Sequence, residues 1–289
     1  MENFSDLLFE ISQNVKSKSL EGYKKQTFLG KFDLLKTHIE ILNDKGVKLF
    51  NRDIGSYTSI YTEKLNPYDS DVKNYCIEVL SEIIKDYILK INKKAETFLV
   101  VGIGNKNYVS DSIGPLVTNQ IIITRHAKIN NPNILDKRLK TVCALTPSVL
   151  GLTGIETYDI VKGVVTNVNP DIIILIDSIL SKSYNYIGKC FQVSNNGLVP
   201  GSGVENARKV LDESTLKVPV ISIGVPLVIT ANNLLNDYFD KDIKELDSLI
   251  VTNKEIDILV KNSAQIVATS INMAIHNKMS FNEILDYMN

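Results

Sequence analysis

The sequence predicts an α/β fold, with a mostly parallel sheet covered by helices on both faces and a small β extension at its N-terminal side. Three short, almost continuously apolar runs predict buried strands at 97–105, 171–177 and 218–226. Segments with helical spacing of apolar residues separate these runs, an alternation typical of parallel strands joined by helices. No repeat, low-complexity stretch or Pro/Gly/Ser-rich linker interrupts the chain, so we expect one domain over 1–289.

The first 65 residues carry a different pattern. Residues 1–30 are polar and mixed, and we expect them to form either a loose arm or a short amphipathic helix. From 31 to 65, apolar and β-favouring residues alternate around an Asn-Asp-Lys-Gly turn signal at 43–46. The expected short antiparallel strands are at 38–42, 47–50 and 55–63. This segment is therefore the predicted β extension.

Helical spacing predicts the elements that cover the sheet. The expected helices lie within 66–94, 112–128, 153–170 and 252–276. Asp69 or Ser70 is expected to cap the first of them, and a Thr-x-x-Glu capping box formed by Thr252 and Glu255 is expected to begin the last. Pro226 is expected to end the third apolar strand.

Composition narrows the function classes. Lys and Arg number 32 against 33 Asp and Glu, a net charge of -1, so no excess of positive charge indicates a nucleic-acid partner. No run reaches the roughly 18 apolar residues that span a bilayer, and the N-terminus lacks the apolar region of a secretory signal. We expect a cytoplasmic protein without a membrane partner. The three cysteines, at 76, 143 and 190, form no paired motif and are expected to be free thiols.

Two acidic residues follow predicted strands and are the candidate catalytic groups. Asp111 lies in "SDSIGP" (110–115), after the first strand and before a helix, and Asp177 is the expected last residue of "DIIILID" (171–177). Ligands and catalytic groups gather beyond the carboxyl ends of parallel strands. Two carboxyls brought together there can share a proton, so that one activates water as a general base and the other polarises a carbonyl.

Each acid also has a structural interpretation. Asp111, beside Ser110, has the type and position of an ordinary helix N-cap. Asp177 is equally suited to cap the turn after its strand or to accept a backbone N–H.

Two glycine-rich loops are expected to shape the site. Gly102 and Gly104 in "VVGIGN" lack the third glycine of a dinucleotide fingerprint, so we expect them, with Asn105, to form a tight turn beside the site. Gly201, Ser202 and Gly203 form a second loop. It has no P-loop lysine, and Ser202 is not in a G-x-S-x-G elbow. No cofactor is expected.

The histidines do not indicate a metal centre. His38, His126 and His276 form no H-E-x-x-H helix, and no cysteine pair complements them. His126 is expected near the C-terminal end of a helix, where a positive side chain is favoured, so its expected role is structural. No metal is therefore expected.

Several segments together resemble the spore germination protease (GPR endopeptidase) family in their order and spacing. They cover about 97–278 and read "VVGIGNKNYVSDSIGPLVTNQIIITRHAK", "ALTPSVLGLTGIETYDIV", "NPDIIILIDSILSKS", "VPGSGVENARK", "PVISIGVPLVI" and "LIVTNKEIDILVKNSAQIVATSINMAIH". The resemblance implies an α/β fold similar to the hydrogenase-maturation endopeptidases. It also implies an atypical aspartate-dependent endopeptidase of the forespore or spore core that forms a homo-oligomer. Its substrates would be the small, acid-soluble, DNA-protecting proteins of dormant spores.

The resemblance extends to individual residues. The family's implicated acids, in its D-x-x-G-P loop and at the end of its acidic apolar strand, fall on Asp111 and Asp177. Family members are zymogens that lose an N-terminal piece. Here "FSDLLFE" (4–10) is similar to the family's T-D-L-A-x-E processing segment, which implies a cut between Asp6 and Leu7.

The chain departs from the family pattern at three places. Val199 stands where the family has His, Ser148 replaces a glycine, and the connection 230–251 is shorter than in typical members. These departures keep a second hypothesis open, a non-enzymatic sporulation factor of the same fold that binds spore-protein peptides. A metal-assisted peptidase and a small-molecule or nucleotide enzyme are the remaining alternatives.

Overall fold

A computed structural model describes residues 5–13, 21–131, 136–200 and 209–288. Within these ranges nine strands form one sheet in the order β1-β2-β3-β7-β8-β6-β4-β5, and β9 pairs with β8. The strands are β1 (Tyr23–Leu29), β2 (Leu35–Ile41), β3 (Gly55–Tyr61), β4 (Thr97–Gly102), β5 (Thr141–Leu145), β6 (Ile172–Ser181), β7 (Cys190–Ser194), β8 (Val220–Thr230) and β9 (Ile250–Val251).

The sheet has a parallel and an antiparallel part. Strands β5, β4, β6 and β8 run parallel, whereas β8, β7, β3, β2 and β1 pair antiparallel in that order. The α-helices are α1 (Leu8–Gln13), α2 (Asp44–Phe50), α3 (Ser70–Ile91), α4 (Ile113–Thr118), α5 (Arg125–Asn130), α6 (Leu150–Thr153), α7 (Thr157–Val168), α8 (Glu213–Leu216), α9 (Ala231–Phe239), α10 (Ile256–Ile275) and α11 (Phe281–Met288). The predicted α/β class, with an N-terminal β extension on a parallel block, is confirmed.

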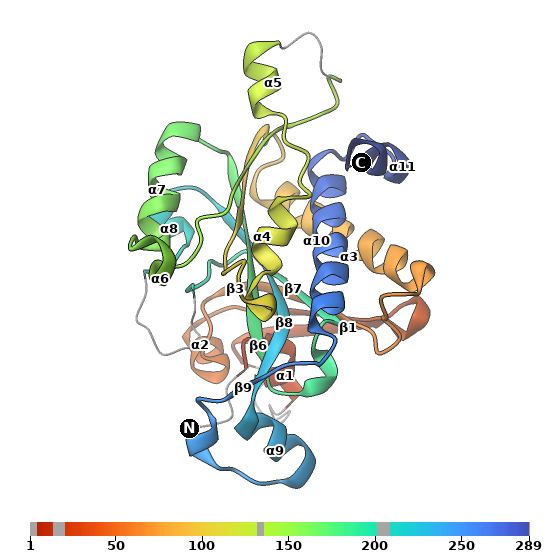
Figure 1. The fold of residues 1–289 in the computed structure, drawn as a ribbon, viewed down its shortest axis with the longest axis vertical. Coiled ribbons are helices and arrows are strands. Elements are labelled where there is room, and N and C mark those ends of the chain that lie inside the picture. Colours follow the sequence, from red (N-terminus) through yellow and green to blue (C-terminus); the bar gives the residue numbers. More distant parts are fainter. Residues whose placement is uncertain (1–4, 14–20, 132–135, 201–208, 289) are drawn as a thin grey trace.

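Helices cover both faces of the parallel block, because successive residues of a strand point to opposite sides. Ile172, Ile174 and Ile176 of β6 pack into a core with α3, α4 and α10. Ile173 and Leu175 pack into a second core with α7 and α8. Figure 1 shows α7 and α8 to the left of the sheet and α3 and α10 to its right.

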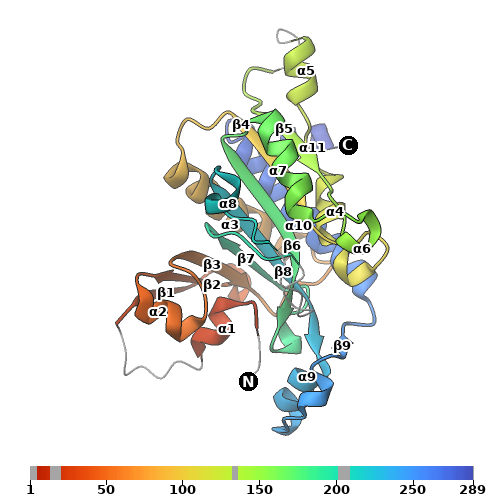
Figure 2. The same cartoon turned by 90° about the vertical axis from the view of Figure 1, so that its left-hand side faces the viewer.

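The N-terminal strands carry a third core. Figure 2 shows α1 and α2 lying against β1, β2 and β3. The buried members of this cluster are Leu7, Leu8, Phe9, Ile39, Ile41, Phe50, Tyr57 and Cys190. Since Cys190 belongs to β7, the cluster joins the β extension to the rest of the sheet.

Two N-terminal expectations were wrong. Residues 47–50 lie in helix α2 rather than in a strand, because Asn43 caps that helix by accepting a hydrogen bond from the Lys45 N–H at 3.0 Å. Residues 23–29 form β1, where an arm or helix was expected; six of its seven side chains are exposed, so the strand carries no apolar alternation. Residues 8–13 do form a short helix.

The strands beside the site run further than expected. β6 continues four residues beyond Asp177 to Ser181, and β8 continues past Pro226 to Thr230. The pairing register of β6 and β8 shifts between Ile179 and Leu180, where Pro226 is the partner of Ile179. A bulge accommodates a residue that has no N–H to donate, so Pro226 does not end its strand.

The predicted helices are present with altered ends. Asp69 caps α3, and its carboxylate accepts hydrogen bonds from the N–H groups of Asp71 and Val72 at 3.1 Å. The expected capping box of α10 is absent, because the Thr252 hydroxyl donates to the Leu227 carbonyl at 2.6 Å and Glu255 is the N-cap without a side-chain bond.

The expected helix over 112–128 is broken. It forms α4 and α5 with an irregular segment between them. The Thr124 hydroxyl donates to the Lys140 carbonyl at 2.6 Å and accepts from the Val142 N–H at 2.8 Å. These two bonds hold the chain on β5, a strand that the sequence did not predict. β7 was also missed.

The described helices include none that is long and apolar enough to cross a membrane. Cys76 and Cys190 are buried free thiols and Cys143 is half-buried. Burial raises the pKa of the Cys76 thiol to about 12.

Candidate active site

The turn after β4 is built on glycines. A Cβ at Gly102 would lie 2.1 Å from the carbonyl oxygen of Gly114, so α4 begins directly against the end of β4. Gly104 has a φ of +120°, and a Cβ there would lie 2.1 Å from the carbonyl oxygen of Asp111. The loop that carries Asp111 is therefore folded tightly back on the strand.

Asp111 ends a short 3-10 turn, Val109–Asp111. The Asn105 N–H donates to both the carbonyl oxygen and the Oδ2 of Asp111, each at 2.9 Å. The side chain is half-buried. Ser112, not Asp111, is the N-cap of α4, and it makes no side-chain cap bond. The N-cap interpretation of Asp111 is thus not what the structure shows.

Asp177 lies where β6 extends beyond the end of its neighbour β4. β4 ends at Gly102 opposite Ile176 of β6, and the Ile103 N–H donates to the Ile176 carbonyl at 2.8 Å. Asp177 is the next residue of β6, still paired with Gly224 of β8 but beyond the end of β4. Its side chain is 7% exposed, and its Oδ1 accepts the Ser178 N–H at 2.8 Å. It is the first polar residue of β6 after five buried apolar ones.

Both acids line one cleft of about 740 Å³. Gly104, Asn105 and Asp6 line it as well, whereas Gly102 is not among its lining residues and Leu7 packs in a hydrophobic core. The departure Val199 also lines this cleft. Gly201, Ser202 and Gly203 lie outside the described residues. The structure thus brings the two predicted acids to the same cavity from two neighbouring strands.

Asp6 of the N-terminal segment 5–8 lines this cleft, and Leu7 and Leu8 pack in a hydrophobic core behind it. The Asp6 carboxylate is 3.1 Å from the Arg52 guanidinium, and its other oxygen accepts the Leu180 N–H at 2.9 Å. The Asp6 N–H donates to the Leu180 carbonyl at 2.9 Å. Leu7 is fully buried. The bond between Asp6 and Leu7, the expected processing site, is therefore enclosed by the protein.

Helix α1 continues this segment and is fixed by Glu10. The Glu10 carboxylate accepts hydrogen bonds from the N–H groups of Lys182 and Ser183 at 3.0 and 2.9 Å, and from the hydroxyls of Ser181 and Ser5. Burial raises the pKa of Glu10, although these four bonds oppose the shift. Burial also raises the pKa of Asp6, with Arg52 acting in the opposite direction.

Sequence reasoning missed two residues of the cleft, Arg52 and Gln192. The Gln192 carboxamide contacts the main chain of the N-terminal segment, and Arg52 contacts its acid. Each partner lies more than 40 positions away along the chain. No local pattern in the sequence marks such contacts, and only the fold brings them together.

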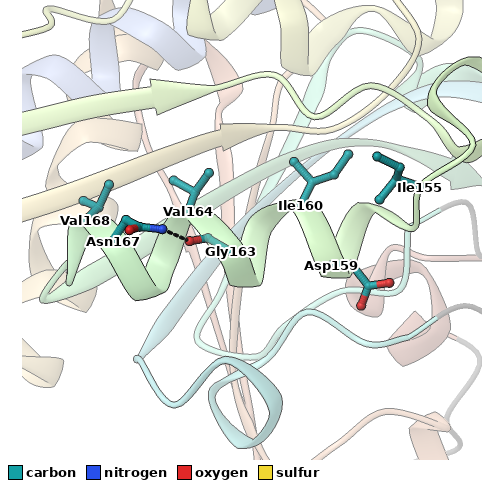
Figure 3. A pocket seen from close by; sticks show the side chains of 7 residues that line it. All are labelled: Ile155, Asp159, Ile160, Gly163, Val164, Asn167 and Val168. Carbon is teal, nitrogen blue, oxygen red and sulfur yellow. Dashed lines mark hydrogen bonds between the residues drawn. The ribbon is translucent and has the colours of Figure 1, made fainter.

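A second hollow lies along α7. Ile155, Ile160, Val164 and Val168 point to one side of the helix in Figure 3, while the Asn167 amide donates to the Gly163 carbonyl at 2.7 Å. Its one acid, Asp159, is 3.1 Å from the Lys209 ammonium. The two predicted catalytic acids, Asp111 and Asp177, therefore line the cleft and not this hollow.

The histidines lie elsewhere. His276 is fully buried, its Nδ1 accepts the Lys140 N–H at 3.1 Å, and burial lowers its pKa to about 4. His38 Nδ1 is 2.8 Å from the Thr58 hydroxyl. His126 is in the first turn of α5, so its expected place near a helix C-terminus was wrong. In the described ranges no three His, Cys, Asp or Glu side chains are grouped to hold a metal ion.

Comparison with known proteins identifies the family to which this chain belongs. A model of the germination protease family matches residues 8–248. The chain is 36% identical to a germination protease of Clostridium tetani over 88% of each protein. It is 33% identical to one of Caldanaerobacter subterraneus subsp. tengcongensis, over 97% of this chain and 96% of that protein.

A search of solved structures finds the [NiFe] hydrogenase maturation protease HycI of Thermococcus kodakarensis, at 15% identity and a TM-score of 0.34. That match covers 65% of this chain and 98% of HycI. The family model spans most of the sequence, and relatives more than 30% identical extend over nearly all of it. This chain therefore belongs to the germination protease family and is a protease of spore germination.

Proposed function

We propose that the protein is an endopeptidase that degrades small, acid-soluble, DNA-protecting spore proteins during germination, with Asp111 and Asp177 as its catalytic pair. The observation that carries this proposal is that both acids line one cleft of a germination protease. The substrate class follows from the family resemblance, as do a homo-oligomeric state and a location in the forespore or spore core.

The chemistry assigned to the pair is activation of water. Asp177 is buried at the end of an apolar strand segment, and Asp111 is half-buried in the loop after β4. Carboxyls in such a site can share one proton, so one takes a proton from water while the other donates a hydrogen bond to the scissile carbonyl. The roles of base and acid therefore belong to the pair, and neither is assigned to one residue alone.

The oxyanion that forms during the reaction needs hydrogen-bond donors. The N–H groups of Ile103 and Asn105 donate to Ile176 and Asp111, so these two main-chain groups are already engaged. The donors proposed for the oxyanion are backbone N–H groups of the two glycine-rich loops, 102–105 and 201–203; in the first loop Ile103 and Asn105 would have to exchange their present acceptors.

Processing is part of the proposal. A cut between Asp6 and Leu7 requires residues 5–8 to detach from the protein, because Leu7 is fully buried and Asp6 is bonded to Leu180 through both its main chain and its side chain. N-terminal sequencing of the protein from dormant and germinating spores tests this step. A mature form that begins at Leu7 is expected, and persistence of Met1 or Glu2 throughout maturation contradicts it.

The direct test is cleavage of a purified α/β-type small acid-soluble spore protein. The unsubstituted protein, Asp111→Asn, Asp177→Asn and the control Asp159→Asn are compared, with and without a chelator, and fragments are identified by mass spectrometry. Asp159 is an exposed acid on α7 paired with Lys209, so its replacement tests for a general effect of lost charge.

We expect discrete fragments from the unsubstituted and Asp159→Asn proteins and none from the other two, whether or not chelator is present. Cleavage that survives in both Asp111→Asn and Asp177→Asn contradicts the assigned pair. Saturable binding of the spore protein without products from any form supports the binding-only alternative. Loss of cleavage in chelator alone supports metal assistance.

A further inference from the structure

The side chain of Gln192 is hydrogen-bonded to the main chain of the N-terminal segment. The Gln192 Nε2 donates to the Asp6 carbonyl at 3.1 Å, and its Oε1 accepts the Leu8 N–H at 2.8 Å. The two bonds fall on either side of Leu7 and involve no side chain of the segment. One carboxamide therefore satisfies both main-chain groups that flank a single residue.

Leu8 is also the first residue of α1, but the two bonds have the donor and acceptor order of a parallel β-bridge. In a parallel pair, one residue donates its N–H to the carbonyl before the facing residue and accepts the N–H of the residue after it. The Gln192 amide supplies the same donor and acceptor from a side chain. A carboxamide carries both groups side by side, which charged or hydroxyl side chains do not.

The same segment is also bonded to the main chain of a strand. The Asp6 N–H donates to the Leu180 carbonyl at 2.9 Å, and Leu180 is in β6, three residues after Asp177. The segment is thus hydrogen-bonded both to β6 and to the Gln192 side chain.

Gln192 also lies in the same row of the sheet as Asp177. Gln192 of β7 faces Gly224 of β8, and Gly224 faces Asp177 of β6. Paired residues on neighbouring strands point to the same face. A main chain held by Gln192 is therefore placed over the face of the sheet that carries Asp177.

From this geometry we propose that Gln192 is a positioning residue that binds the main chain of the substrate peptide. The proposal rests on the proposed peptidase function of the cleft. The ligand class is an unfolded polypeptide, recognised through a carbonyl and the N–H two residues later and not through its side chains. In the present structure residues 6–8 of the chain itself take up both hydrogen bonds of Gln192, so a substrate replaces them there.

The first substitution weakens the attachment of residues 5–13 and leaves Gln192, the proposed main-chain clamp, unchanged. Glu10→Gln puts an NH₂ group among the N–H donors of Lys182 and Ser183, which favours release of α1. Gln192→Met and Gln192→Glu are then added to this variant. Gln26→Met is the matched control, because Gln26 is an exposed glutamine on β1.

The first readout is binding of a fluorescent peptide with the sequence ENFSDLLFEI, followed by anisotropy. We expect the Kd to rise about tenfold with Gln192→Met, since two hydrogen bonds are lost, and less with Gln192→Glu, which keeps the acceptor. Gln26→Met is expected to leave the Kd unchanged. An equal Kd for Gln192→Met and its parent, or no binding to any form, overturns the proposal.

The second readout is cleavage of the spore protein by the same variants. A clamp predicts a several-fold higher KM with kcat less affected, whereas a merely structural glutamine would lower thermal stability and kcat and leave KM unchanged. If no form cleaves the spore protein but peptide binding depends on Gln192, the proposed function fails and the clamp stands. If cleavage occurs with KM unaffected by Gln192, the clamp fails and the proposed function stands.

Discussion

Asp177 and Gln192 stand in one row of the sheet with only Gly224 between them. Neighbouring strands are about 4.8 Å apart, so the two main chains are separated by roughly 10 Å. Ile179 lies over the glycine, and a Cβ at position 224 would be 2.7 Å from its Cδ1. The row therefore carries two polar side chains at the ends of a short apolar floor.

Gly224→Ala tests whether this floor has room for one more methyl group. We expect a loss of about 1–3 kcal/mol in the free energy of unfolding, because overpacking forces Ile179 to move. The displaced side chain is also expected to narrow the cleft and lower activity. Denaturant unfolding and cleavage assays check both effects, and Ile179→Val in the same chain is expected to restore part of each. Failure of Ile179→Val to restore either one would contradict this account.

Gly104→Ala is expected to be the most damaging small substitution at the site. Its φ of +120° disfavours any side chain, and the added Cβ would meet the Asp111 carbonyl at 2.1 Å. We expect a loss of at least about 2 kcal/mol in stability together with most of the activity, since Asp111 must move. Thermal unfolding and spore-protein cleavage provide the measurements.

The control for this substitution is Gly163→Ala. Gly163 lies within α7, and no atom is within 4 Å of a Cβ built there. Alanine is favoured over glycine in a helix by about 0.5–1 kcal/mol, so this variant should be slightly more stable and fully active. An unchanged activity in Gly104→Ala would show that Asp111 is not placed by this contact.

The attachment of residues 5–13 to the rest of the protein, here called docking, should depend on pH. Burial raises the pKa values of Asp6 and Glu10 above their ordinary values of 3.8 and 4.5. A raised pKa in the docked state means that docking is strongest below these ordinary values and weakens as the pH rises through the raised ones. Hydrogen exchange of residues 6–10, corrected for intrinsic rates, should show decreasing protection over that range. Glu10→Gln should reduce the pH dependence, and equal slopes would contradict it.

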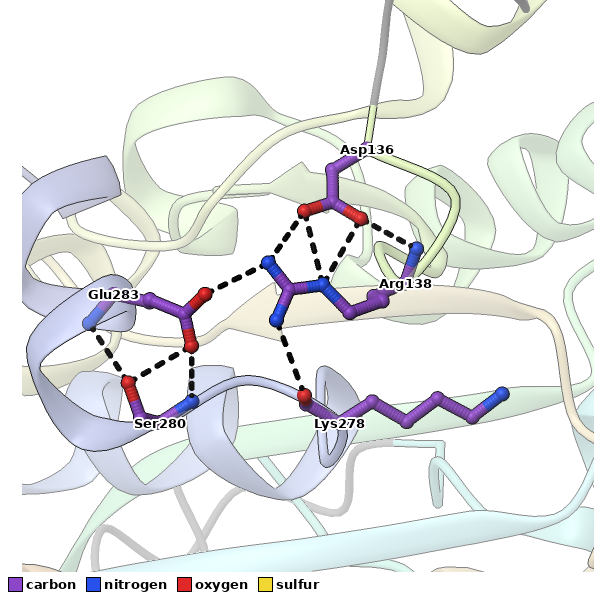
Figure 4. Close-up of polar contacts among 5 residues, drawn as sticks. All are labelled: Asp136, Arg138, Lys278, Ser280 and Glu283. Carbon is purple, nitrogen blue, oxygen red and sulfur yellow. Dashed lines mark hydrogen bonds and ion pairs between the residues drawn. The ribbon is translucent and has the colours of Figure 1, made fainter.

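One arginine bonds the start of the C-terminal helix α11, whose Ile284 is also buried in an apolar cluster. Arg138 is 2.7 Å from both Asp136 and Glu283, and Glu283 also accepts hydrogen bonds from Ser280 at the start of α11 (Figure 4). The hydrogen bond from Arg138 lowers the pKa of Glu283 to about 2. This contribution to stability is present above pH 4.5 and is lost as the pH falls through about 2.

Glu283→Gln should therefore loosen α11 at neutral pH and leave the cleft unchanged. Faster hydrogen exchange in 281–288 is expected, with a small change in melting temperature that high salt reduces. Asp286→Asn, on the same helix, serves as the control. If both variants exchange alike, the arginine does not hold the helix.

Much of the fold was predictable because its central strands are continuous apolar runs in the sequence. The apolar runs that became β4, β6 and β8 are covered on both faces, and such strands are visible as continuous hydrophobic stretches. β1 was invisible because both of its faces are exposed. β5 and β7 are short strands of five residues, and neither was recognised between the helices and turns around it.

The two acids were predictable for a related reason. Asp177 interrupts an apolar run and Asp111 follows another, so each stands out from its neighbours. Gln192 does not, because a glutamine in a strand is unremarkable until the fold places residues 6–8 against it. The helix α2 was mistaken for a strand since its cap, Asn43, lies within a turn signal.

The attachment of residues 6–8 to Gln192 also affects how peptide binding to this protein should be measured. Residues 6–8 belong to the same chain as the groups that bind them, so they are present at a local concentration on the order of millimolar whatever the protein concentration. A peptide added from solution competes against that fixed concentration. Its apparent affinity for the full chain is therefore lower than the intrinsic affinity of the emptied cleft, and dilution of the protein will not reveal the difference.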